Sequence, residues 1–569
     1  MGLLAWPALA GLPASLDRVP ESALVVASVR NIESFSANVN RLNAALPASN
    51  RIPLGMMGDL MGTAGLNAGG SISLALMPSP DGQPLDMDGE QGPLVVIVPV
   101  TDANAFVQGL GGTPGAGIME VQVGDETAFA KDIGGGYVVM GPVREVVQAF
   151  SGEGGQGARH ERAVGPVGLR VAQQSDTVII ANIPALRPQL EQGLEGMKEQ
   201  AQMFAMMAGQ QGDQVQQQMQ MVEMVAGSFL RDARVGMVGL GFGETGVRVD
   251  LAANFNEGSE IGGFFDAPGD SRGVLARVPD VPFLFAGSAD FSSPGMQKLM
   301  NNMTEMAMQA NEGLPNAMNP ATFMQGLDGI GYVIGTPGAL MGGLFTNTVY
   351  YYKTSDPEAY TRNYSRMLNE MNGMQIEGMT YTTAYQGGGA QVEGQQVDTY
   401  SMSIRPNPND PGAMQAQQMM MMMFGPSMGA SGYIGKAEGG LVMTMSQNTP
   451  LMSQAMRTAE NGNGLARNRS LRSVAEQMPE GATFESYIGV GSIFTTVNSF
   501  LAMMGAGMDI QVPADLAPIG IGGTTDRGGF QARVVVPTQV IETFAAMAQQ
   551  FEEMNGAGEP APAPARPRF

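Results

Sequence analysis

The sequence predicts an α+β protein of tandem duplicated units, in which mainly antiparallel sheets are covered by helices. Three observations predict it. An apolar residue, a proline and an acid recur ahead of strand-like runs. Glycines recur ahead of other strand-like runs that lead into helical segments. Hairpins and helices alternate without the long uniform βαβ rhythm of a parallel sheet. At 569 residues the chain is also too long for one ordinary core.

The opening motif begins at Val19, Val278 and Met478, and each copy is followed by a strand-like run. A fourth such run follows Asp176 without the proline. Because this run is apolar at alternate and intervening positions, we expect a strand buried on both faces. The helix expected after it repeats apolar residues at spacings of three and four, which predicts one packed stripe: Leu186, Leu190, Leu194 and Met197.

Glycines mark the other end of each unit, where they suit a tight hairpin turn before an outgoing strand. Each glycine-led strand leads into an expected helix. Gly135 and the fourth strand-like run, taken from residue 174, are separated by the same interval as Gly439 and Met478 (174 − 135 = 39 and 478 − 439 = 39). The shared order and spacing favour a duplication. The glycine-led strands start at Gly135-Gly136, Gly246, Gly439-Gly440 and Gly528-Gly529.

These signals divide the chain into a leader, two α+β halves and a tail. Residues 1–18 form the leader, and the Pro/Ala-rich residues 554–569 are expected to be a flexible tail. Each half holds a long and a short unit. The first half is 19–270, with units 19–150 and 174–265, and the second is 271–553, with units 278–457 and 478–553.

Composition excludes several classes of function. The formal net charge of −23, without a basic stripe, argues against nucleic-acid binding. The absence of cysteine removes disulfides, thiolate metal sites and cysteine nucleophiles. His160 is the single histidine, and we expect it in a solvated glycine-rich loop, which leaves no Ser-His-Asp triad elsewhere. We predict no enzyme, no cofactor and no metal.

The first ten residues form a short apolar run closed by Ala8-Leu9-Ala10, which is typical of an export signal with its cleavage site. The run is too short to span a bilayer. No later segment is long and apolar enough to act as an anchor. We therefore expect a periplasmic or secreted bacterial protein without a transmembrane anchor.

Two acidic or glycine-rich motifs resemble known ligand loops. Residues 241–246 match G-x-G-x-x-G, but a strand rather than a helix is expected after them, so we interpret them as a hairpin turn. Residues 86–90 start like a calcium loop but lack the later glycine and glutamate, which favours a solvated hairpin loop.

Methionine is the most unusual residue, with 46 copies gathered in clusters. Thioethers suit Cu(I), flexible methionines suit apolar ligands or partner helices, and methionine also fills irregular helix packing. All three interpretations remain open. The expected surface for a protein partner, an apolar small molecule or a lipid comprises Met203, Met206, Met207, Met221, Met224, Met419, Met420, Met421, Met422 and Met423.

The Val19-Pro20-Glu21 opener before an apolar strand, the short export signal and the tandem units resemble an uncharacterised bacterial family. Its members are secreted proteins with a domain of unknown function, frequent in planctomycete-type genomes. The resemblance implies an extracytoplasmic setting and no assigned activity. The leading hypothesis is an exported, non-enzymatic binding or interaction protein, with an apolar groove under the Met-rich helices. The alternatives are a Met-based Cu(I) buffer and a carboxylate-dependent hydrolase.

Overall fold

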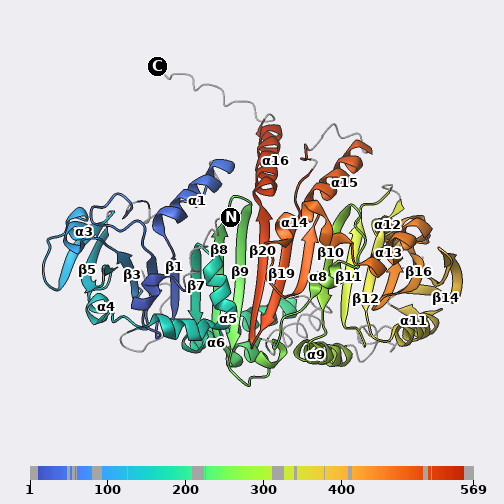
Figure 1. Ribbon diagram of the computed structural model, residues 1–569, viewed down its shortest axis with the longest axis horizontal. Helices are drawn as coiled ribbons and strands as arrows, with labels where there is room; N and C mark the ends of the chain where they lie inside the picture. Colours follow the sequence, from blue (N-terminus) through green and yellow to red (C-terminus); the bar gives the residue numbers. More distant parts are fainter. Residues whose placement is uncertain are drawn as a thin grey trace, which may run out of the picture.

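The computed structural model is an α+β structure whose strands join side by side into one large, open, antiparallel sheet (Figure 1). The predicted α+β class with mainly antiparallel strands is confirmed, but the strands form one continuous sheet that is not divided between units. The described residues are 11–47, 51–53, 58, 60–79, 92–124, 126–207, 223, 226–310, 326–338, 342–376, 378–407, 413–503, 511–513 and 515–556.

The strand pairings give the order of the sheet from one edge to the other. It runs β4 (Ile118–Val123), β5 (Glu126–Gly134), β6 (Tyr137–Gly141), β3 (Leu94–Pro99), β2 (Ile72–Leu76), β1 (Val25–Val29), β7 (Thr177–Asn182), β8 (Ala233–Phe242), β9 (Gly246–Phe255), β20 (Gly529–Pro537), β19 (Ile519–Asp526), β18 (Ala482–Ile488), β10 (Phe283–Asp290), β11 (Gly329–Gly335), β12 (Thr348–Lys353), β17 (Gly440–Thr444), β16 (Gly429–Ala437), β15 (Gln395–Pro406), β14 (Met379–Val392) and β13 (Gln375–Ile376).

Helices cover the middle of the sheet and project from its two long sides (Figure 1). In this view α5, α8 and α14 lie in front of the central strands, α1, α15 and α16 stand above, and α6 and α9 lie below. The helices are η1 (Ala14–Arg18), α1 (Ile32–Ala45), α3 (Ala103–Gly109), α4 (Arg144–Ala149), α5 (Gly157–Gln174), α6 (Ile183–Met207), η4 (Gly262–Phe264), α8 (Ser271–Leu275), α9 (Pro294–Ala310), α11 (Pro357–Met371), α12 (Ala413–Phe424), η7 (Gly425–Ser427), α13 (Thr449–Asn461), η8 (Leu465–Arg467), α14 (Arg469–Ala475), α15 (Val490–Met503) and α16 (Thr538–Gly556).

The recurring sequence motifs mark real elements. The three openers precede β1, β10 and β18, and the run after Asp176 is β7. The glycine-led runs are β6, β9, β17 and β20, followed by α4, η4, α13 and α16. Local capping explains several helix starts: the Asn448 side chain accepts a hydrogen bond from the Leu451 amide, and a proline follows at the first turn of α13.

The sheet has a matching strand order on the two sides of the β9–β20 seam. Outward from the seam, the first half runs β9, β8, β7, β1, β2, β3, β6, β5, β4. The second half runs β20, β19, β18, β10, β11, β12, β17, β16, β15. Strands at the same distance from the seam are those that the sequence motifs paired. Only β14 and β13 at the outer edge of the second half lack a counterpart among the described strands.

The register of the seam is symmetric about one pair of residues. Gly246 pairs with Pro537 at one end, and Asn254 pairs with Gly529 at the other. Asp250 and Arg533 pair midway between them. The middle of the whole sheet is therefore occupied by an acid from one half and a base from the other.

Asp250 and Arg533 form a buried, two-pronged ion pair. Asp250 is fully buried and Arg533 is 2% exposed. The Arg533 Nε lies 2.7 Å from Asp250 Oδ1, and Nη2 lies 3.1 Å from Oδ2. Gln531 Nε2 donates to the same carboxylate at 2.7 Å. The remaining Arg533 donors reach the Gln174 side chain and, at 2.6 Å, the Gln477 carbonyl oxygen.

A second arginine lies close to this pair. Arg248 donates to the Gln174 carbonyl oxygen, while its Nε finds no partner among the described residues. Burial lowers the pKa of Arg248, and the positive charge of Arg533 lowers it further. The seam thus brings three charged side chains close together: Arg248, Asp250 and Arg533.

The cores of the two halves differ in chemistry. The first half packs mainly valine and alanine around β1, β3, β7 and α5. The second half adds a cluster of tyrosines between α11 and strands β12, β14 and β15. Their rings pack against one another: Tyr352 and Tyr360 are tilted with centroids 5.1 Å apart, and Tyr364 meets Tyr400 edge-on with centroids 5.6 Å apart. Burial raises the pKa of each of these four phenols, to about 12 for Tyr360.

Two detailed expectations for the short unit of the first half are wrong. In β7, Val178 and Ile180 are buried, but Thr177, Ile179 and Ala181 on the other face are only half-buried. The expected packed stripe of α6 is also incomplete, because Leu190 and Met197 are exposed. Both differences have one cause: α5 covers one face of the central strands, whereas α6 lies toward their ends (Figure 1).

Candidate functional site

The methionine run of the second half lies on α12, and its members point in different directions. Successive helical residues are about 100° apart, so five consecutive methionines cannot share one face. Met420 is buried, Met423 is half-buried, and Met419, Met421 and Met422 are exposed. Met420 is therefore the methionine that packs into the protein, and most of its neighbours in the run face solvent. None of the five lines any of the three pockets described below.

The other expected methionines contribute little to a described surface. Met203 is exposed on α6. Met206 and Met207 fall within the bounds of α6, but their side chains lie outside the described residues, as do Met221 and Met224 altogether. A groove under the Met-rich helices thus remains a prediction.

The α12 geometry predicts opposite outcomes for neighbouring methionines. Met420→Gln is expected to lower the free energy of unfolding by about 2–3 kcal/mol, because it buries an amide in place of an apolar side chain. The matched change Met422→Gln, at a residue that is 60% exposed, is expected to stay within about 0.5 kcal/mol. Urea titrations followed by circular dichroism compare the two. Equal losses in both variants would contradict the assignment of Met420 as the methionine that packs into the protein.

The three segments that the sequence predicted to be loops have different outcomes. Residues 241–246 form the turn between β8 and β9, as predicted, with the Gly243 amide donating to the Gly246 carbonyl oxygen at 2.9 Å. Residues 86–90 lie outside the described residues. His160 is not in a solvated loop: it is buried on α5, and its Nε2 lies 2.8 Å from the Val19 carbonyl oxygen. The flanking glycines concealed this helix from sequence reasoning.

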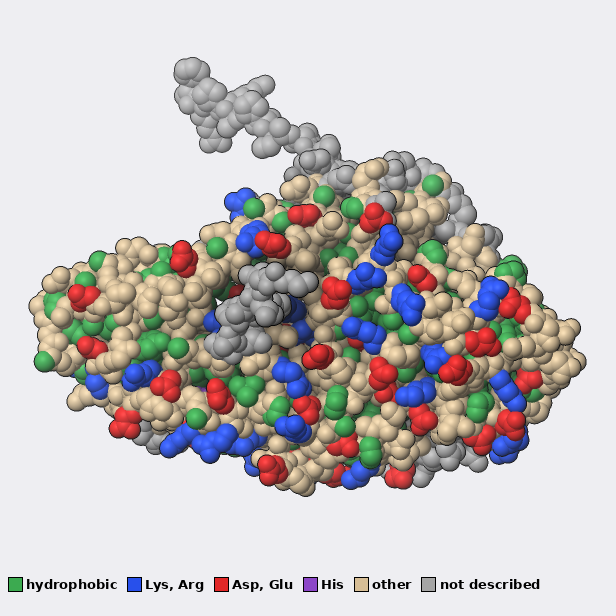
Figure 2. All heavy atoms as spheres, in the orientation of Figure 1, with side chains coloured by type: hydrophobic (Ala, Val, Ile, Leu, Met, Phe, Trp, Pro, Cys, Tyr) green, Lys and Arg blue, Asp and Glu red, His purple; other side chains and the backbone are tan. Residues whose placement is uncertain are grey.

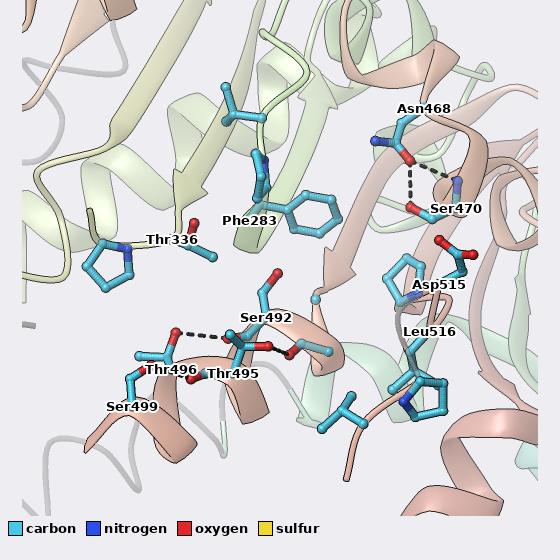
Figure 3. A pocket seen from close by; sticks show the side chains of 18 of the residues that line it. Phe283, Thr336, Asn468, Ser470, Ser492, Thr495, Thr496, Ser499, Asp515 and Leu516 are labelled. Atoms are coloured by element: carbon cyan, nitrogen blue, oxygen red, sulfur yellow. Dashed lines mark hydrogen bonds between the residues drawn. The ribbon is translucent and has the colours of Figure 1, made fainter. Parts of the chain in front are cut away.

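Described residues of the second half form a pocket of about 720 Å³. We call it the α15 pocket. One wall is α15, and the others are the start of β10, the segment after β11, the start of α14 and the segment before β19 (Figure 3). Its size is typical of a small-molecule site.

The wall supplied by α15 is a stripe of hydroxyl groups that points into the pocket (Figure 3). The spacing of three, one and three residues places all four on one helical face. The opposite face of α15 carries Phe494, which packs edge-on against Phe544 of α16 with ring centroids 5.5 Å apart. Packing against α16 therefore turns the hydroxyl stripe toward the hollow. The stripe is Ser492, Thr495, Thr496 and Ser499.

The facing walls add one charge and several apolar groups. Asp515 is exposed, and it is the only charged residue among those that line the pocket. Asn468 caps α14, its Oδ1 accepting from the Ser470 amide at 2.9 Å and from the Ser470 hydroxyl at 2.6 Å (Figure 3). Apolar contact is offered by Val281, Phe283, Val512 and Leu516.

A smaller pocket of about 160 Å³ occupies the corresponding place in the first half. It is lined by the segment before β1, the first turns of α5, the end of β7, the start of α6 and the start of β8. Its polar residues are Glu21, His160, Asn182 and Arg234, so its chemistry differs from that of the α15 pocket. A third hollow, of about 330 Å³, is lined by β4 and the segment that precedes it.

The described residues contain no group of three or more His, Cys, Asp or Glu side chains placed to hold a metal ion. Within the same residues, no helix has the length and apolarity needed to cross a bilayer. Acidic and basic side chains mingle over the centre of the face shown in Figure 2, so the negative charge is not gathered into one patch there.

Sequence reasoning missed the α15 pocket, although one signal was present. Hydroxyl residues at 492, 495, 496 and 499 follow a helical period that the apolar pattern alone does not report. No family model, curated protein or solved structure matches the chain.

Proposed function

We propose that this chain is an exported, non-enzymatic binding protein that holds a small ligand, or a short segment of a partner, in the α15 pocket. The observation that carries the proposal is the hollow of about 720 Å³, with its stripe of hydroxyls facing an apolar wall. A hollow of this size, in which polar groups and apolar side chains converge, is typical of ligand sites. Export is supported by the Ala8-Leu9-Ala10 signal alone, and membership of the secreted family stays a prediction.

The pocket can be filled without disturbing the fold. A Cβ added at Gly491 would lie 3.6 Å from the Leu516 Cβ and 3.9 Å from the Val512 Cγ1, which are ordinary contacts. Gly491→Leu is therefore expected to occupy the hollow and to abolish ligand retention. Gly193→Leu on α6 is the matched control, because a Cβ there meets nothing within 4 Å.

Native mass spectrometry of gently purified protein tests both parts of the proposal. Unsubstituted protein and Gly193→Leu should carry an extra mass that Gly491→Leu lacks. A ligand-free spectrum for all three proteins, together with no uptake from a small-molecule library, would sink the binding proposal. The same spectrum of envelope material should show loss of the first ten residues, and a retained Met1 would contradict export.

We also propose that the two halves arose by duplication. Support comes from the matching strand order about the seam, the symmetric β9–β20 register and the corresponding places of the two pockets. An experimental structure in which residues 19–265 fail to superpose on 278–553 strand for strand would contradict the duplication.

A further inference from the structure

We infer that the α15 pocket takes a ligand with an ammonium group, which lies against Asp515 while its carbon chain follows the apolar wall. This inference rests on the proposed function and names the chemical class of its ligand. It depends on which hydrogen-bonding groups the pocket leaves free and on the charge at its rim.

Several hydroxyl groups that line the pocket donate their hydrogens to acceptors within the protein. The hydroxyls of Thr495, Thr496 and Ser499 donate to carbonyl oxygens one turn earlier in α15, at 2.9, 2.8 and 2.9 Å. A hydroxyl whose hydrogen is engaged in this way still offers oxygen lone pairs. Three of the four hydroxyls on the α15 wall therefore present acceptors, and a ligand that matches these three must bring donors.

The opening of α14 shows the same arrangement. The Ser470 hydroxyl donates to Asn468 Oδ1, and the Asn468 amide nitrogen donates to Asp280 Oδ1 at 2.6 Å. Each of the two groups thus spends one hydrogen inside the protein, and the Asn468 amide retains a second one. The amide contact also places the carboxylate of Asp280 just behind the pocket wall.

The charge of the pocket lining favours an ammonium ligand over a neutral polyol. Asp515 lines the pocket, and no lysine, arginine or histidine does. Arg467 and Arg469 flank Asn468 in the chain but are exposed and do not line the pocket. A pocket whose one charged lining residue is a carboxylate favours a cation, and a net charge of −23 raises the local concentration of cations around the protein.

The apolar wall favours a ligand whose remaining part is a hydrocarbon chain. Val281, Val512 and Leu516 line the pocket together with the ring of Phe283. These groups bind hydrocarbon but cannot satisfy further charges. An ammonium on an alkyl stem therefore fits both walls, whether it belongs to a free amine or to a lysine side chain.

Calorimetric titration of the full chain with 1,5-diaminopentane tests the inference. The diamine is expected to bind, and 1,5-pentanediol and pentanedioate of similar length are expected to bind at least about tenfold more weakly. Asp515→Asn should weaken diamine binding about tenfold or more, since it replaces a charged acceptor by a neutral amide. Added salt should weaken it as well.

Two controls separate the class of ligand from the existence of the site. Glu480→Gln removes an exposed acid that does not line the pocket, and it should leave diamine binding unchanged. Gly491→Leu should abolish diamine binding. Equal binding of the diol or dianion, or indifference to Asp515→Asn, overturns the ammonium assignment. If none of the three probes binds while a native ligand is still lost in Gly491→Leu, the ammonium fails and the binding function stands.

Discussion

Replacing Arg533 by glutamine is expected to lower the free energy of unfolding by about 3–5 kcal/mol, among the largest effects of any single polar substitution in this chain. The change strands the fully buried Asp250 carboxylate without its two-pronged partner. Gln531 supplies one neutral donor, which cannot replace a guanidinium. Because β9 and β20 join the two halves, the loss falls on the seam of the sheet. Urea unfolding followed by circular dichroism measures it as a lower transition midpoint.

The control is an ion pair of the same kind at the surface. Arg457 and Glu393 are paired, but both side chains are well exposed. Arg457→Gln is therefore expected to cost no more than about 1 kcal/mol. In the double variant Asp250→Asn/Arg533→Gln, the loss should be smaller than the sum of the two single losses, because neither partner is left charged. An Arg533→Gln loss no larger than that of Arg457→Gln would refute the buried pair.

Alkaline pH is expected to unfold the second half through its tyrosine cluster. Burial raises the folded-state pKa of Tyr352, Tyr360, Tyr364 and Tyr400 above the unfolded value of about 10. The folded protein therefore keeps these protons longer than the unfolded chain does. Stability from this source is fully present below about pH 10 and falls above it; the contribution of Tyr360 is lost as the pH rises through its folded pKa of about 12. Each such phenol contributes a loss of about 1.4 kcal/mol per pH unit in that window.

A tyrosinate absorbance titration with parallel circular dichroism checks this expectation. Ionisation of the cluster should coincide with loss of secondary structure between about pH 10 and 12. Tyr360→Phe removes one ionising group and should move the alkaline midpoint upward, relative to its own stability at neutral pH. Tyr137→Phe, in the first half and outside the cluster, should not move it. Gradual ionisation without unfolding would show that the phenols are accessible to solvent.

The candidate site shows where the sequence was a poor guide. Methionine clusters drew attention because the residue is rare in such runs, yet on α12 the helical twist separates Met420 from its exposed neighbours. No single serine or threonine of α15 stands out in the sequence as the methionine clusters do. Serine and threonine in a helix commonly bond to the preceding turn, so only their shared face identifies them as a wall. What they face is set by the start of β10, which comes from a distant part of the chain, and by the segment before β19, which follows α15.

His160 is a second residue whose environment the sequence did not predict. Its glycine-rich, arginine-flanked sequence is typical of a solvated loop, but its Nε2 bonds the Val19 carbonyl oxygen far away in the chain. That contact exists only because α5 packs against the segment before β1. Local composition describes a residue's neighbours in sequence, whereas burial depends on its neighbours in space.

By itself, the sequence determined the α+β class, the antiparallel strands and the paired motifs, because turns, alternation and helical periods are local properties of the chain. The openers before β1 and β10 and the glycines before β6 and β17 are examples. Only the tertiary structure decided that both halves share one sheet. That outcome depends on β9 meeting β20 in a register centred on Asp250 and Arg533. Two residues of opposite charge, far apart in the chain, become a pair only when the halves close on each other and exclude water from both.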